Sequence, residues 1–126
     1  MCIRDSAIQV ALGGRQSIFE LTGTGGRLLR QRNIAYEKLN EIPGVSAVKP
    51  MGSLYLFPRL DPNVYEIHDD AKLMLDILKA EKILMVQGTG FNWPNPDHFR
   101  VVTLPWASQI ENAIERLGNF LVSYKQ

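Results

Sequence analysis

Arg100 carries the clearest chemical information in this sequence. It is a lone cation in the mostly apolar run 98–104, and Gly88 and Gly90 precede it by twelve and ten residues. A cation that a strand buries is costly unless an anion neutralises its charge. Arginine suits a carboxylate because its planar guanidinium can hold both oxygens at once, which lysine cannot do. The pattern therefore predicts a carboxylate-binding site.

The residues alone leave a second interpretation of Arg100 open. The side chain could lie at a strand edge, where its charge reaches water or pairs with an acid such as Asp97, since most charged residues are solvated. Gly88 and Gly90 also have two possible interpretations. Without a Cβ atom, glycine allows the backbone to approach a ligand closely, but it also forms ordinary turns.

Other candidate motifs are weaker. His68 and His98 are thirty residues apart and Cys2 is the one cysteine, so we expect no metal site and no internal disulfide. The glycine-rich stretch 22–26 lacks the preceding strand and the spacing of a phosphate loop, and we interpret it as a hinge. Trp93 lies in a proline-rich polar loop, where its bulk predicts that it covers a ligand or a subunit surface.

The composition indicates an ordinary globular protein. The chain has 126 residues, of which 45% are hydrophobic and 21% charged, and its formal net charge is +1. The basic residues form no patch, so we expect no nucleic-acid partner. No stretch approaches the roughly 20 apolar residues that span a bilayer, and no secretory signal precedes the first helix. We expect a cytoplasmic protein without a membrane partner.

Hydrophobic periodicity predicts the elements that position these residues. Helices are expected at 7–12, 28–42, 70–78 and 108–124, and strands at 45–49, 53–58, 83–86 and 99–104. Asp69 or Asp70 is expected to cap the third helix, and a capping box from Ser108 to Glu111 to begin the fourth. We expect the first two strands to form a hairpin and 83–86 to be covered on both faces. The order predicts an α/β (α+β) fold, a small sheet with helices packed on it.

Three segments in this order resemble a known family. Residues 50–58, 86–91 and 99–102 are similar to the signature of the small domain of class I pyridoxal-phosphate-dependent aminotransferases, and most similar to bacterial alanine (glutamate/pyruvate) aminotransferases. The resemblance implies the C-terminal small domain of a fold-type I enzyme over 26–126. It makes 7–25 the end of the large domain and a hinge, and leaves 1–6 as a non-native leader.

The resemblance also implies roles for residues. Arg100 matches the arginine that grips the substrate's α-carboxylate, and Gly88 and Gly90 would contribute to substrate binding. Pyridoxal 5'-phosphate would be held by a lysine in the large domain, because no lysine here follows the Ser-x-Ser pattern of that residue. We therefore expect no catalytic and no cofactor-binding residue in this fragment, and no activity from the fragment alone.

For the parent enzyme, the resemblance implies transfer of an amino group between alanine and 2-oxoglutarate by a homodimer. Its partners would be amino acids and 2-oxo acids. Two other functional classes stay open at this stage. One is a non-enzymatic α/β module that binds a small acid or regulates a partner, and the other is a purely structural interaction domain.

Overall fold

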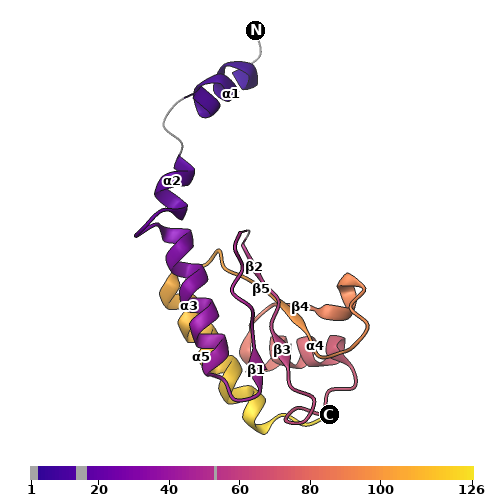
Figure 1. Cartoon of the computed structure of the whole chain (residues 1–126). Coiled ribbons are helices and arrows are strands. Elements are labelled where there is room, and N and C mark those ends of the chain that lie inside the picture. The colour runs from indigo at the N-terminus through magenta and orange to yellow at the C-terminus, as the bar shows by residue number, and fades with distance from the viewer. Residues whose placement is uncertain (1–2, 14–16, 53) are drawn as a thin grey trace.

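The computed structural model describes residues 3–13, 17–52 and 54–126. The helices are α1 (Ile3–Gly13), α2 (Ser17–Thr22), α3 (Arg27–Glu41), α4 (Asp70–Glu81), α5 (Ala107–Ser123) and the short 3-10 helix η1 (Gly88–Phe91). The strands are β1 (Val45–Ser46), β2 (Tyr55–Leu56), β3 (Arg59–Leu60), β4 (Val86–Gln87) and β5 (Phe99–Val102). Helix α1 extends away from the rest of the chain (Figure 1), whereas α2 contacts α3.

Strand β5 is the centre of the main sheet. Its neighbours are β2 and β4, both antiparallel to it, while β1 and β3 form a separate antiparallel pair. Tyr55 lies opposite Val102, and Val86 lies opposite Arg100. A single bridge between Arg59 and His98 connects β3 to the residue before β5. Arg100 is thereby held in the best-paired strand of the molecule.

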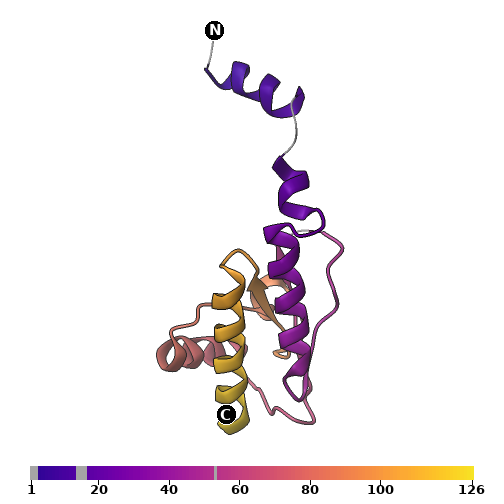
Figure 2. The ribbon, with the colours of Figure 1, turned by 90° about the vertical axis from the view of Figure 1, so that its left-hand side faces the viewer.

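Two long helices cover one face of this sheet. Helices α3 and α5 lie side by side in both views (Figures 1 and 2), and α4 packs against α5 and β4. The buried core joins these helices to the strands through Ala35, Leu39, Leu56, Leu60, Leu73, Ile77, Phe99, Ile110, Ile114, Leu117 and Leu121. Neighbouring strand residues point to opposite faces. Phe99 therefore enters the core, and Arg100 points away from it.

The ends of α4 and α5 follow from local hydrogen bonds. The Asp69 side chain caps α4 by accepting a hydrogen bond of 2.9 Å from the backbone N–H of Lys72, which confirms the predicted cap. The predicted capping box from Ser108 to Glu111 is wrong. A cap at Ser108 would start the helix at Gln109, but α5 starts at Ala107 and its N-cap is Trp106. There the Gln109 side chain accepts a hydrogen bond of 3.1 Å from the backbone N–H of Trp106.

The small sheet with helices packed on it is confirmed, but two strand predictions are wrong. Residues 45–49 and 53–58 do not form a hairpin, because β1 pairs with β3 while β2 pairs with β5. The apolar run 83–86 is not a strand covered on both faces. Its strand is limited to β4, and Leu84 is 79% exposed. Both errors concern partners distant in sequence, which local patterns do not specify.

Candidate functional site

Arg100 lies on the outward face of β5 between two aromatic rings. Its guanidinium carbon Cζ is 4.7 Å from the ring centroid of Tyr55 and 4.5 Å from that of Phe91. The Nε atom is buried and has no hydrogen-bond partner among the described residues. Aromatic faces attract a cation but supply no hydrogen-bond acceptor in the guanidinium plane. The rings therefore hold the side chain in place while its Nε–H donor stays unused.

Asp97 is engaged elsewhere, which removes the predicted alternative partner of Arg100. Its carboxylate accepts hydrogen bonds from Arg59 Nε at 3.2 Å and Trp93 Nε1 at 2.9 Å, and lies 2.7 Å from His98 Nδ1. Burial raises the pKa of Asp97, but hydrogen bonds from His98 and Trp93 outweigh it and lower the pKa overall. Within the described part of the chain, Arg100 forms no ion pair with any acidic side chain.

The two glycines of η1 have different surroundings. Gly88 is buried against β5: its N–H donates to the His98 carbonyl at 2.8 Å, and an added Cβ would lie 2.7 Å from that oxygen. Gly90 is exposed, and a Cβ there would meet only the Gln87 side chain, at 3.6 Å. Packing therefore accounts for Gly88. A role for Gly88 and Gly90 in substrate binding stays a prediction.

Asp70 is a part of this site that the sequence did not indicate. The sequence predicts a helix cap at Asp69 or Asp70, yet the Asp70 side chain does not cap α4 and is almost fully buried, at 3% exposure. It accepts hydrogen bonds from the backbone N–H of Thr89 at 2.9 Å and from the Thr89 hydroxyl at 2.7 Å. The two bonds fasten η1 to the first turn of α4. No local pattern could reveal them, because the two residues are nineteen positions apart.

Aromatic side chains surround the Arg100 face. Phe57 stacks on His98 with the ring centroids 5.0 Å apart, and Trp93 lies 4.3 Å from His98. The Phe57 and Phe91 rings meet edge to face at 6.3 Å. These contacts and the hydrogen bond to Asp97 explain why Trp93 is ordered in its loop. Its predicted role in covering a ligand or a subunit surface stays untested.

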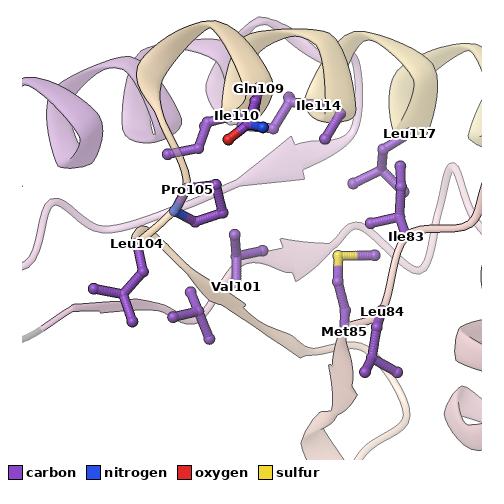
Figure 3. Close-up of a pocket in the computed structure, with 12 residues that line it drawn as sticks. Ile83, Leu84, Met85, Val101, Leu104, Pro105, Gln109, Ile110, Ile114 and Leu117 are labelled. Carbon is purple, nitrogen blue, oxygen red and sulfur yellow. The ribbon is translucent and has the colours of Figure 1, made fainter.

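A separate apolar pocket of about 330 Å³ lies between β5 and α5 (Figure 3). Val101 of β5, Met85 and Ile83 face Ile110, Ile114 and Leu117 of α5 across it. None of its lining residues is charged. A carboxylate would lose its hydration there without gaining a partner, so this pocket does not compete with Arg100 as the anion site.

Neither a metal site nor a membrane span emerges from the part of the chain that the structure describes. There, no three side chains of His, Cys, Asp or Glu are grouped so that they could hold a metal ion. Across the same residues, no helix combines the length and apolar character needed to cross a membrane.

Comparison with known proteins decides the family. No family model matches the chain. The alanine aminotransferase of Mycobacterium tuberculosis is 71% identical over 120 residues, covering 95% of this chain and 28% of that protein. A glutamate-pyruvate aminotransferase of Escherichia coli is 58% identical over the same length, covering 30% of that protein. The crystal structure of an aminotransferase from Escherichia coli superposes with a TM-score of 0.92 at 57% identity, covering 95% of this chain and 30% of that one.

The chain belongs to the aminotransferase family. It corresponds to a C-terminal part of these proteins and spans about 30% of the length of the curated relatives it matches. Its fold is that of the fold-type I aminotransferases, as the resemblance of residues 50–58, 86–91 and 99–102 implied.

Pyridoxal phosphate dependence is a trait of this family. The cofactor of such enzymes forms an imine with a lysine, so the lysines of this segment are the residues to consider. A lysine that forms an imine needs a lowered pKa, because the neutral amine is the nucleophile. Hydrogen bonds to Glu41 and Asp76 instead raise the pKa values of Lys38 and Lys72, respectively. The remaining lysines are exposed at Lys49, Lys79, Lys82 and Lys125. That the cofactor is held by residues outside this chain stays a prediction.

Proposed function

We propose that this chain is the substrate-clamping part of an enzyme that moves an amino group between alanine and 2-oxoglutarate. In this proposal Arg100 binds the α-carboxylate of the substrate. The supporting observation is its geometry: the guanidinium lies between Tyr55 and Phe91, its Nε is buried without a partner, and no acidic side chain of the described residues forms an ion pair with it. A carboxylate ligand would supply the missing charge.

The chemistry of the reaction favours one shared carboxylate site. Alanine, glutamate and both of their 2-oxo acids carry a carboxylate attached directly to the carbon that gains or loses nitrogen. A single arginine can therefore hold all four molecules in the same place. A carboxylate bound through two hydrogen bonds fixes the orientation of the adjacent amino or carbonyl carbon, which converts a random encounter into a positioned one.

In this proposal Arg100 binds and orients the substrate, and pyridoxal phosphate is held by residues outside this chain. The raised pKa values of Lys38 and Lys72 and the exposed positions of Lys49, Lys79, Lys82 and Lys125 support that division. We expect the isolated chain to be inactive and the whole protein to be a homodimer. Transamination by the purified 126-residue chain above a no-protein control would contradict the first expectation.

A chimera tests the proposal in a complete enzyme. The chain would replace the matching 120 residues of the mycobacterial relative, whose 71% identity favours correct folding. We expect this chimera to transaminate alanine with 2-oxoglutarate. Arg100→Lys should raise KM for both substrates by about ten- to a hundredfold, the range that corresponds to losing a charged hydrogen bond.

Arg30→Lys is the matched control, because Arg30 is an exposed arginine on α3. It should leave both KM values unchanged. Equal KM values in the Arg100→Lys variant and the unmodified chimera would remove Arg100 from the substrate site. A folded chimera that cannot transaminate would instead favour the non-enzymatic binding module. Absence of any binding to small carboxylates would favour the structural interaction domain.

A further inference from the structure

The two rings that flank Arg100 are held in different ways. Tyr55 lies in β2 and is fixed by strand pairing opposite Val102, which makes it a diagonal neighbour of Arg100 on the same face. Phe91 is the last residue of η1 and belongs to no strand. Its position therefore depends on what holds η1 in place.

The two hydrogen bonds from Thr89 to Asp70 hold η1 in place. Asp70 accepts the backbone N–H and the hydroxyl of Thr89, two residues before Phe91. The backbone N–H groups of Asn92 and Trp93 then close the turn onto the Thr89 and Gly88 carbonyls. The two hydrogen bonds from Thr89 supply the partners that this buried side chain needs in the first turn of α4.

We propose that Tyr55 and Phe91 are positioning residues for the Arg100 clamp. In this scheme Asp70, bonded to Thr89, sets Phe91 against the guanidinium and so determines how tightly a small carboxylate binds. The inference rests on the proposed function of Arg100. It adds the Asp70–Thr89 pair to the site, 30 and 11 residues before Arg100 in sequence.

The physical basis is preorganisation. A free arginine side chain populates many rotamers, and binding a ligand must restrict them. Two flanking rings restrict them before the ligand arrives and fix the plane of the guanidinium fork. Ring faces attract the cation less strongly than a carboxylate does. Because the ring faces supply no acceptor in the guanidinium plane, its N–H donors remain available to an incoming carboxylate.

The first experiment uses the 126-residue chain and does not depend on catalysis. In an ¹⁵N-labelled sample, Arg100→Lys assigns the Nε–H signal of Arg100 by its loss. Because Nε lies between two rings, we expect ring currents to move this signal away from those of exposed arginines. Phe91→Leu should abolish most of the displacement. Asp70→Asn and Thr89→Val should reduce it, and Thr89→Ser should preserve it because serine keeps both donors.

Asp76→Asn is the matched control for Asp70→Asn, because Asp76 is an acid on the same helix that pairs with Lys72 instead of η1. It should leave the Arg100 signal in place. An unchanged signal in Asp70→Asn and in Thr89→Val would overturn the proposed link from α4 to Arg100. An unchanged signal in Phe91→Leu would overturn the role of the ring itself.

The second experiment measures affinity in the chimeric enzyme with propionate, a carboxylate that lacks an amino group and competes with alanine. We expect Phe91→Leu, Asp70→Asn and Thr89→Val each to weaken propionate inhibition by roughly three- to thirtyfold, the range of a cation–π contact. Values of kcat at saturating alanine should change less than twofold, and Thr89→Ser should restore the original affinity.

The outcomes separate this inference from the proposed function. If Arg100→Lys weakens propionate inhibition but Phe91→Leu and Asp70→Asn do not, the clamp stands and the positioning role fails. If Arg100→Lys itself has no effect on propionate, the clamp fails. Equal losses in kcat and in propionate affinity with Asp70→Asn would indicate a general structural role, and would overturn the specific one.

Discussion

The two faces of β5 differ sharply although they belong to the same four residues. On the inward face, Phe99 is 1% exposed and Val101 packs against the same core. On the outward face, Arg100 lies among aromatic rings, and two of them, Tyr55 and Phe91, are 47% and 44% exposed. One face consists of apolar contacts that exclude water, whereas the other presents a cation and partly exposed rings.

This difference separates stability from recognition. The inward face contributes through apolar area removed from water, which is the main stabilising term in folding. The outward face leaves large apolar rings exposed around a cation for which the described residues supply no ion pair, a combination typical of an interaction surface. Substitutions on the two faces should therefore act on different quantities: the free energy of unfolding for one and ligand affinity for the other.

Phe99→Ala tests the inward face and has the largest expected effect on stability. Removing this buried ring leaves a cavity in the core, and we expect the free energy of unfolding to fall by about 3–5 kcal/mol. Chemical denaturation monitored by circular dichroism measures it. Phe91→Ala on the outward face is the matched control and should cost clearly less, because that ring is already 44% exposed. Similar losses for the two would contradict the assignment of stability to the inward face.

The glycines of η1 give a second, smaller test. Gly88→Ala places a Cβ 2.7 Å from the His98 carbonyl oxygen, so we expect destabilisation of about 1–3 kcal/mol from overpacking. Gly90→Ala meets only a flexible side chain at 3.6 Å and should change stability by less than about 0.5 kcal/mol. Thermal unfolding compares them. A raised KM for alanine in a stable Gly90→Ala chimera would support the predicted contact of Gly90 with substrate.

Two buried polar groups without partners allow a third comparison. The Gln31 amide of α3 is 1% exposed, and neither of its polar atoms has a hydrogen-bond partner among the described residues, as is true of Arg100 Nε. An unpaired buried amide is destabilising, so Gln31→Met, which keeps the shape, should raise stability by about 1–2 kcal/mol. It should leave propionate affinity unchanged, whereas Arg100→Met should abolish it. Loss of stability in Gln31→Met would show that the Gln31 amide has hydrogen-bond partners in the folded protein.

Particular residues show what could be predicted from the sequence. Leu73 and Ile77 recur at helical spacing and both lie in the core, and Arg100 stands out because a cation is unusual in an apolar run. The strand partners could not be predicted, because β1, β2, β3 and β4 have two residues each, too few for an alternating pattern. The contact of Asp70 with Thr89 was equally inaccessible, since it depends on how α4 packs against η1.

Asp97 provides the smallest and most specific test, because it ties the outward face together through Arg59, Trp93 and His98. Its pKa in the folded chain is below the ordinary value of 3.8. In acid the unfolded chain therefore binds the proton more readily, so this carboxylate contributes stability above about pH 4 that is lost as the pH falls through its lower, folded pKa.

Asp97→Asn should remove this pH-dependent contribution. The difference in unfolding free energy between the original chain and the variant should be greatest above about pH 5 and shrink toward pH 3. Urea titrations across this range measure it, with Glu37→Gln, an exposed acid on α3, as the control. A difference that stays constant with pH would mean that the Asp97 charge does not stabilise this face. The aromatic rings alone would then hold the surroundings of Arg100.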